Sequence, residues 1–438
     1  MKIGVISLGC AKNLVDTENL LGILKESGQE IVTSGKDAEA VIINTCGFIE
    51  SAKSEAIETI LDTADLKQDG LKKLIVMGCL SQRYKPQLEA EMPEVDRFIA
   101  IDEYGNLGAI LSEVLGVHIV NTYGKSQRVL SGKPWMAYLR IADGCDNRCS
   151  YCAIPLIRGD MRSMDEDALV KEAEMLAEKG VKELNLIAQD SSRYGYDIDG
   201  QLHLSSLLKR LDEIEGFRWI RVLYLYPDEI PDDLIETIRN SRHILPYFDI
   251  PVQHGSDRML KLMHRRGSHD IIVERCRKIR ESFDHAVLRT TLIAGFPSET
   301  EEDHEETLRL IREIHWDHLG CFTYSREEDT PSYEMEDDVP AEVKEQRMAE
   351  IMELQAGIVE EEHRKLIGVE DEVLVEGYEP LGRMYTGRSA LYAPDGVDGM
   401  VRFRSERIIQ TGEFAKVRYT KVHGHNMIAE EAEDEKNI

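Results

Sequence analysis

The length, composition and charge of this chain predict a soluble protein of several domains. It has 438 residues, 42% of them hydrophobic and 31% charged, and it contains no apolar run long enough to cross a membrane. One hydrophobic core rarely organises this length, so we expect two or three domains. The net charge of −29 argues against a surface that wraps nucleic acid and suits a basic partner better, although general solubilising charge also explains it.

The beginning of the chain and its cysteines indicate where the protein works. An apolar segment follows Met1 at once, without the zones of a signal peptide, so we expect a cytoplasmic protein with no membrane partner. Eight cysteines occur at uneven spacing. In an unexported protein this usage favours metal or redox chemistry over disulfide bonds.

Residues 1–120 are expected to form the first domain, because they repeat an apolar strand, a cysteine and an amphipathic helix. The strands are expected at 3–8, 40–44 and 73–77, and the cysteines that follow them are Cys10, Cys46 and Cys79. This repeat predicts an open parallel α/β sheet, whose ligands bind at the carboxyl ends of the strands. The three cysteines are therefore expected to converge, although free cysteine is commonly a small buried hydrophobe.

A loose stretch at 121–134 is expected to be a linker to a second α/β domain at 135–366. Its strands are expected at 136–141, 183–188, 219–225, 247–250, 287–293 and 319–324. Such repeated units predict a partial (β/α)6 barrel, with chemistry at the carboxyl ends of its strands. Gln189 and Gln253 lie just past two of these ends and are candidate cofactor-binding residues, although they also suit plain turns.

The last part of the chain changes character after a long helix that opens at Pro340 and ends at Gly368. Residues 367–430 alternate short β-prone stretches with turns, which predicts a small antiparallel β-barrel. The acidic residues 431–438 are expected to form a disordered tail.

Cys145, Cys149 and Cys152 form a CxxxCxxC motif directly after the first barrel strand. Structural zinc and electron-transfer clusters normally take four protein ligands, so three thiols in one loop predict a cluster with one iron left open. Zinc binding or a chance spacing is the alternative. Arg148 and Arg158 lie nearby and could balance the negative charge of a cluster or of a cofactor carboxylate, although exposed arginine is the ordinary explanation.

With these motifs, nearly the whole chain resembles the methylthiotransferases of the radical S-adenosylmethionine superfamily. The resemblance implies a radical cluster on the CxxxCxxC cysteines and a second 4Fe-4S cluster on the cysteines of Gly9-Cys10, Asn44-Thr45-Cys46 and Gly78-Cys79. It also implies two roles for S-adenosylmethionine, as radical source and as methyl donor. The stretch from Arg289 to Thr300 resembles a Gly-Phe-Pro motif of the family, with Ser298 where glycine is usual, and makes Arg289 a candidate cofactor-binding residue. The C-terminal barrel looks like a TRAM domain.

Within the family, the stretches 7–16, 46–50 and 251–256 resemble the branch that modifies a ribosomal protein. That resemblance implies a methylthio group placed on the β-carbon of an aspartate in the twelfth protein of the small ribosomal subunit, with an external electron donor. The alternatives are a tRNA adenosine methylthiotransferase (MiaB-like) and a non-catalytic iron-sulfur module associated with the ribosome. The charge of the C-terminal barrel makes tRNA the weaker alternative, since residues 371–421 hold eight acidic and eight basic side chains.

Overall fold

The first part of the chain is an open sheet of five parallel strands in the order β2-β1-β3-β4-β5, which confirms the predicted open parallel sheet and adds two strands to the three expected. The computed structural model describes residues 1–124, 128–394 and 396–432. The strands are β1 (Lys2–Ser7), β2 (Glu30–Val32), β3 (Ala40–Thr45), β4 (Lys73–Gly78) and β5 (Arg97–Ile99). The helices are α1 (Ala11–Glu26), α2 (Glu50–Asp65), α3 (Cys79–Glu91) and α4 (Leu107–Leu115).

The second part is an open barrel of six parallel strands in the order β13-β12-β11-β10-β9-β6, which confirms the predicted partial (β/α)6 barrel. The strands are β6 (Met136–Arg140), β9 (Glu183–Ile187), β10 (Trp219–Val222), β11 (Ile244–Asp249), β12 (Val287–Ala294) and β13 (His318–Thr323), and a small pair, β7 (Ala142–Asp143) and β8 (Arg162–Ser163), lies beside the sheet. The helices are α5 (Ile154–Arg158), α6 (Glu166–Glu178), α7 (Tyr196–Asp199), α8 (Leu204–Asp212), α9 (Asp232–Arg239), α10 (Asp257–Leu262), α11 (His269–Ser282) and α12 (Glu301–Ile314).

The third part follows the long helix α13 (Ala341–Lys365) and is a closed five-stranded barrel. Its strands are β14 (Glu370–Glu379), β15 (Met384–Arg388), β16 (Val401–Arg404), β17 (Phe414–His423) and β18 (Asn426–Glu431). The antiparallel prediction holds for every pair except β16 and β18, which run parallel. Glu431, expected in the acidic tail, ends β18, whereas residues 433–438 of that tail lie outside the described residues. The expected domain boundaries stay predictions.

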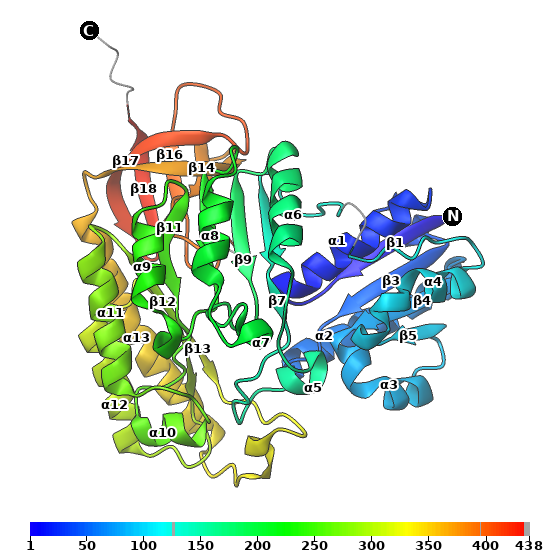
Figure 1. Cartoon of the computed structure of the whole chain (residues 1–438), viewed down its shortest axis with the longest axis horizontal. Coiled ribbons are helices and arrows are strands. Elements are labelled where there is room, and N and C mark those ends of the chain that lie inside the picture. The colour runs from blue at the N-terminus through cyan, green and yellow to red at the C-terminus, as the bar shows by residue number, and fades with distance from the viewer. Residues whose placement is uncertain (125–127, 395, 433–438) are drawn as a thin grey trace.

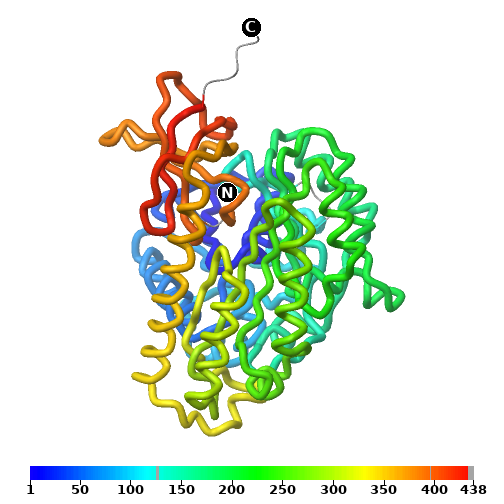
Figure 2. Tube along the Cα trace, turned by 90° about the vertical axis from the view of Figure 1, so that its left-hand side faces the viewer, coloured from blue at the N-terminus to red at the C-terminus, as the bar shows by residue number. Residues whose placement is uncertain are grey.

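The C-terminal barrel and α10 lie at opposite ends of the central sheet, and α13 runs along the side of the molecule between those ends (Figure 1, Figure 2). One cluster of buried apolar side chains contains residues of all three parts. It includes Val15 of α1, Leu223 and Tyr247 of the central part, and Val401 and Phe403 of the C-terminal barrel. The three parts therefore share a core. No helix within the described residues combines the length and the apolar character needed to span a membrane.

A buried ion cluster fixes the C-terminal barrel to the amino end of β9. Glu183 accepts hydrogen bonds from Arg388 of β15 at 2.6 Å and from Arg221 of β10 at 3.3 Å, and none of the three side chains is more than 1% exposed. Arg388 also pairs with Glu376 at 2.9 Å. Because an unpaired charge in such a place is costly, the cluster holds the two parts in one arrangement.

We expect Glu183→Gln to lower the free energy of unfolding by about 3–5 kcal/mol, because it leaves two buried guanidiniums short of an anion. The matched control is Glu370→Gln, since Glu370 also faces two cations, Lys416 and Arg418, but on the surface, and its loss should change stability little. Urea denaturation followed by circular dichroism measures both variants. Equal stability of the two variants would contradict the assignment.

Candidate active site

Cys10, Cys46 and Cys79 lie just past the carboxyl ends of the neighbouring strands β1, β3 and β4. Glycines allow their close approach. Gly9 and Gly78 have φ angles of +90° and +105°, and a Cβ atom on Gly9 would lie 2.8 Å from the Cβ atom of Cys46. The thiols of Cys10 and Cys46 also lie near enough to Cys79 to influence its pKa. The three cysteines thus meet at one edge of the sheet.

Asn13 in the first turn of α1 fastens this edge. Its side-chain amide donates to the backbone carbonyls of Leu8 and Thr45 at 3.1 and 3.0 Å, and its Oδ1 accepts from the Cys79 thiol at 3.4 Å. The Asn44 side chain donates in turn to the backbone carbonyl of Asn13 at 2.8 Å. This network holds the cysteine-bearing segments in place without help from a ligand.

Cys145, Cys149 and Cys152 lie on the loop after β7. Cys145 and Cys149 are buried, Cys152 is partly exposed, and the first two lie near enough to influence the pKa of the third. Ser150 anchors the loop, since its N–H donates to the backbone carbonyl of Met263 at 3.0 Å. The second set of three thiols therefore also occupies one small region on a fastened loop.

Arg158, at the end of α5, joins the two cysteine sets. Its guanidinium donates to both carboxylate oxygens of Asp143 at 3.0 Å, to Asp16 Oδ2 at 2.9 Å and to Asn13 Oδ1 at 3.0 Å. Its Nη2 lies 3.8 Å from the Cys79 sulfur. Asp143 begins the segment that carries the second cysteine set. The Arg158 side chain therefore connects α1, beside the first set, to the segment that holds the second set.

Asp16 is the buried acid at this junction. It is ion-paired with both Arg140 of β6 and Arg158, and it accepts a hydrogen bond from the Tyr123 hydroxyl at 2.8 Å. Burial alone would raise the pKa of Asp16, but the two guanidiniums outweigh it and lower that pKa below its usual range. The carboxylate is therefore ionised and balances charges from the central part of the chain.

Cys149 has two polar neighbours of its own. The Tyr226 hydroxyl lies 3.3 Å from its sulfur, and Arg265 Nη1 lies 3.7 Å from it. The Arg265 guanidinium is stacked 3.9 Å from the centre of the Tyr226 ring and donates to the backbone carbonyl of Pro251. Within the described residues no carboxylate forms an ion pair with Arg265, so its charge is available to stabilise a thiolate.

Gln189 and Gln253, the predicted loop candidates, differ in their surroundings. Gln189 Nε2 donates to Asp143 Oδ1 at 3.3 Å, and its Oε1 is buried without a hydrogen-bond partner among the described residues. Gln253 donates within its own loop, to the backbone carbonyl of Pro251 at 3.2 Å. Cofactor binding stays a prediction for both, and Gln189 is the one with an unused acceptor.

Arg158 and Arg289, the predicted cofactor-binding arginines, both have carboxylate partners. Arg289 pairs with Asp249 of β11 and with Asp398 of the C-terminal barrel, each at 3.1 Å. Their roles toward a cofactor stay predictions. Ser298, in the same motif as Arg289, has φ +68°, the left-handed conformation that a glycine would adopt there.

Each cysteine set offers three thiols, the number that a 4Fe-4S cluster with one open iron would take from the chain. In the described part of the chain, no three His, Cys, Asp or Glu side chains are placed to hold one metal ion. In a 4Fe-4S cluster each cysteine binds its own iron, so three separated thiols suit it and leave one iron open. Burial raises the pKa of Cys79 to about 12 and that of Cys145 to about 11, so iron must displace a proton from each.

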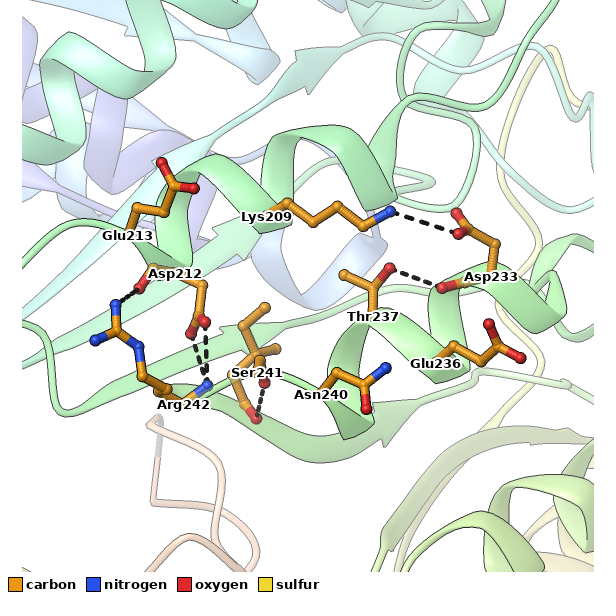
Figure 3. Close-up of a pocket in the computed structure, with 10 residues that line it drawn as sticks. Lys209, Asp212, Glu213, Asp233, Glu236, Thr237, Asn240, Ser241 and Arg242 are labelled. Carbon is orange, nitrogen blue, oxygen red and sulfur yellow. Dashed lines mark hydrogen bonds and ion pairs between the residues drawn. The ribbon is translucent and has the colours of Figure 1, made fainter.

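A surface pocket elsewhere on the molecule is a poor candidate site. It has a volume of about 360 Å³ and lies between α8, α9 and the start of β11, on the outside of the central part (Figure 3). Lys209, Asp212 and Arg242 on its wall pair with neighbouring protein groups. It contains no cysteine and lies away from both cysteine sets.

Comparison with known proteins identifies the family. The models of the uncharacterized protein family UPF0004, the radical SAM superfamily and the TRAM domain match residues 2–100, 139–311 and 367–431. The ribosomal protein uS12 methylthiotransferase RimO of Aquifex aeolicus is 44% identical over 434 residues, which cover 99% of this chain and 98% of that protein. The RimO of Pelotomaculum thermopropionicum is 48% identical over 427 residues, with 95% and 96% covered. The chain belongs to the RimO family.

As a RimO-family protein, the chain is a transferase of the radical SAM superfamily, and its cofactors are 4Fe-4S clusters and S-adenosylmethionine. Among solved structures, the radical S-adenosylmethionine methyltransferase TsrM from Kitasatospora setae has a similar fold. Its TM-score is 0.57 at 12% identity, over 76% of this chain and 74% of that one. At this identity the likeness concerns the fold alone.

Lys12 and Asp16 lie within the stretch 7–16 that carried the resemblance, but the sequence assigned no role to them, and it did not single out Arg265. Cys10 directly precedes α1, and Lys12 and Asp16 follow in the first two turns of that helix, where both are buried. Arg265 lies in a His-Arg-Arg stretch that resembles an exposed basic turn. Its burial depends on contacts far away in the sequence.

We expect the reconstituted chain to hold about eight iron atoms, four for each cysteine set. Alanine at Cys10, Cys46 and Cys79 together should halve the iron content, and so should alanine at Cys145, Cys149 and Cys152. The control is Cys276→Ala with Cys321→Ala, because Cys276 lies in the central core and Cys321 packs against it. Iron and sulfide analysis after anaerobic reconstitution measures the effect. About four irons in the unaltered chain would contradict the prediction of two clusters.

Proposed function

We propose that this chain adds a methylthio group to the β-carbon of an aspartate in the ribosomal protein uS12. The observation that carries the proposal is the pair of three-cysteine sets connected through Arg158. One set suits the cleavage of S-adenosylmethionine and the other suits the handling of sulfur. The names of the RimO relatives supply the class of substrate.

Cys145, Cys149 and Cys152 hold the radical cluster in this proposal, and Cys10, Cys46 and Cys79 hold the second cluster. When bound, the clusters and S-adenosylmethionine supply reductive sulfonium cleavage, hydrogen removal from carbon, sulfur and a methyl group. The cleavage consumes an electron, so an external electron donor is part of the proposal. The cytoplasm, where ribosomal proteins are accessible, is the proposed location.

The chain's own residues hold these groups in place and exclude water. Arg265 and the Tyr226 hydroxyl stabilise the charge on Cys149, while Arg158 does the same for Cys79. Asp16 balances Arg140 and Arg158, so the two cysteine sets keep a fixed relation. Asp16 and Arg158 are buried, so water is excluded from this pair, whereas Cys10 is exposed.

Alanine at Cys10, Cys46 and Cys79 should separate the two halves of the reaction. Reduced enzyme carrying these changes should still release 5′-deoxyadenosine from S-adenosylmethionine but should form no methylthio product. Chromatography of the nucleoside and mass spectrometry of the protein substrate measure the two outcomes. If deoxyadenosine release is lost while circular dichroism shows an intact fold, the division of labour is wrong.

The surface of the C-terminal barrel favours a protein substrate over tRNA. Three of its arginines have carboxylate partners within the chain, so they offer little charge to phosphates. On this surface, Arg402 pairs with Glu379, Arg407 pairs with Glu413 and Glu431, and Arg418 pairs with Glu370. The net charge of −29 would in turn attract a basic ribosomal protein at a rate that falls with salt.

We expect the reduced enzyme to modify uS12, or a peptide with its target loop, and not an anticodon stem-loop offered in the same reaction. Mass spectrometry should find the added methylthio group on the aspartate alone. The same peptide with asparagine at that position is the control for site selection. Modification of the RNA alone would assign the chain to the tRNA branch instead.

A further inference from the structure

Lys12 is a buried lysine without a direct anionic partner. Its side chain belongs to the first turn of α1, two residues after Cys10, and the residue is only 7% exposed. Its ammonium lies 3.4 Å from the centre of the Tyr224 ring. Within residues 1–124, 128–394 and 396–432, no hydrogen bond or ion pair involves the side chain of Lys12. Buried ammonium groups are normally paired, so this arrangement needs an explanation.

The carboxylates near Lys12 are already bound by arginines, and the other anionic neighbour is the Cys10 thiol, which the proposed function assigns to iron. Arg158 takes both oxygens of Asp143 at 3.0 Å, and Arg289 takes Asp249 at 3.1 Å. The negative charge of these carboxylates stabilises the Lys12 ammonium from a distance, but their oxygens accept hydrogen bonds from the arginines and not from Lys12. Lys12 therefore keeps its hydrogen-bond donors available for a group that comes from outside the chain.

Tyr224 acts as a rigid support beneath the ammonium. It follows β10 with φ +64°, and its backbone N–H donates to Asp249 Oδ2 at 3.0 Å. An ammonium that rests on the face of a ring directs its N–H groups partly away from that ring. The ring thus holds the charge of Lys12 in place without consuming its capacity to bind an anion.

We propose that Lys12 binds the side-chain carboxylate of the substrate residue and so presents the adjacent carbon to the two cysteine sets. The inference rests on the proposed function and deepens it, because it names the group that recognises an acidic residue. Lys12 lies beside Cys10, and Arg158, whose charge also reaches it, connects to the segment that begins the other cysteine loop. Because Lys12 also lies near Asp143, which begins that loop, a carboxylate held by Lys12 would place its neighbouring carbon between the two sets. The charge-assisted bond would favour an acid over its neutral amide.

The test compares two peptides of the uS12 target loop, one with aspartate and one with asparagine, on the iron-loaded full chain. Fluorescence anisotropy should show that the unaltered protein binds the aspartate peptide about tenfold or more tightly than the asparagine peptide. Lys12→Met should reduce that ratio to about one, and Lys12→Arg should restore most of it. Lys25→Met, at the exposed end of the same helix, should leave the ratio unchanged.

Iron content, visible absorption and 5′-deoxyadenosine release without peptide serve as controls for the cofactors and the fold. A ratio that stays near its original value in Lys12→Met overturns the inference. Loss of iron or a shifted cluster reduction potential with that ratio unchanged would make Lys12 a counter-charge for the cluster. If the unaltered enzyme modifies RNA and neither peptide, the proposed function itself fails. If it modifies the aspartate peptide and only the ratio test fails, the inference about Lys12 fails alone.

Discussion

The arrangement of this molecule depends on the ion pairs that the buried carboxylate of Asp16 forms with two arginines. Asp16 belongs to the first helix of the chain, yet the cations that it balances, Arg140 and Arg158, belong to the central barrel. Asp143 is the carboxylate of the central part that pairs with both arginines, so without Asp16 two buried guanidiniums would share one anion, and an undercompensated buried charge costs several kcal/mol. The contact between the two parts is therefore specified by charge as well as by shape. The same ion pairs fix the position of one cysteine set relative to the other.

Much of the fold could be predicted because its signal is local. The strands that precede the cysteines are apolar runs that end at serine, threonine and glycine, and α12 follows its capping residue Thr300 as the helical periodicity indicates. The short edge strands β2 and β5 have three residues each, too few for a pattern to be recognised. The parallel pairing of β16 with β18 depends on barrel closure, which no local pattern reports.

The site divides in the same way. The CxxxCxxC spacing is contained in one loop, so the sequence pointed to those residues directly. Arg265 and Lys12 owe their importance to burial against Tyr226 and Tyr224, contacts made only once the chain has folded. Resemblance identified the cysteines and the chemistry, but the charges that surround them required the structure.

The chain of contacts that begins at Asp398 has a consequence for chimaeric enzymes. This residue of the C-terminal barrel holds Arg289, Arg289 holds Asp249, and Asp249 fixes the backbone of Tyr224. The barrel thus contributes, through Arg289 and Asp249, to the support of the tyrosine that lies against Lys12. A barrel exchanged between relatives would have to bring its own equivalent of Asp398, or Arg289 would lose one of its two carboxylate partners and the support of Tyr224 would be weakened.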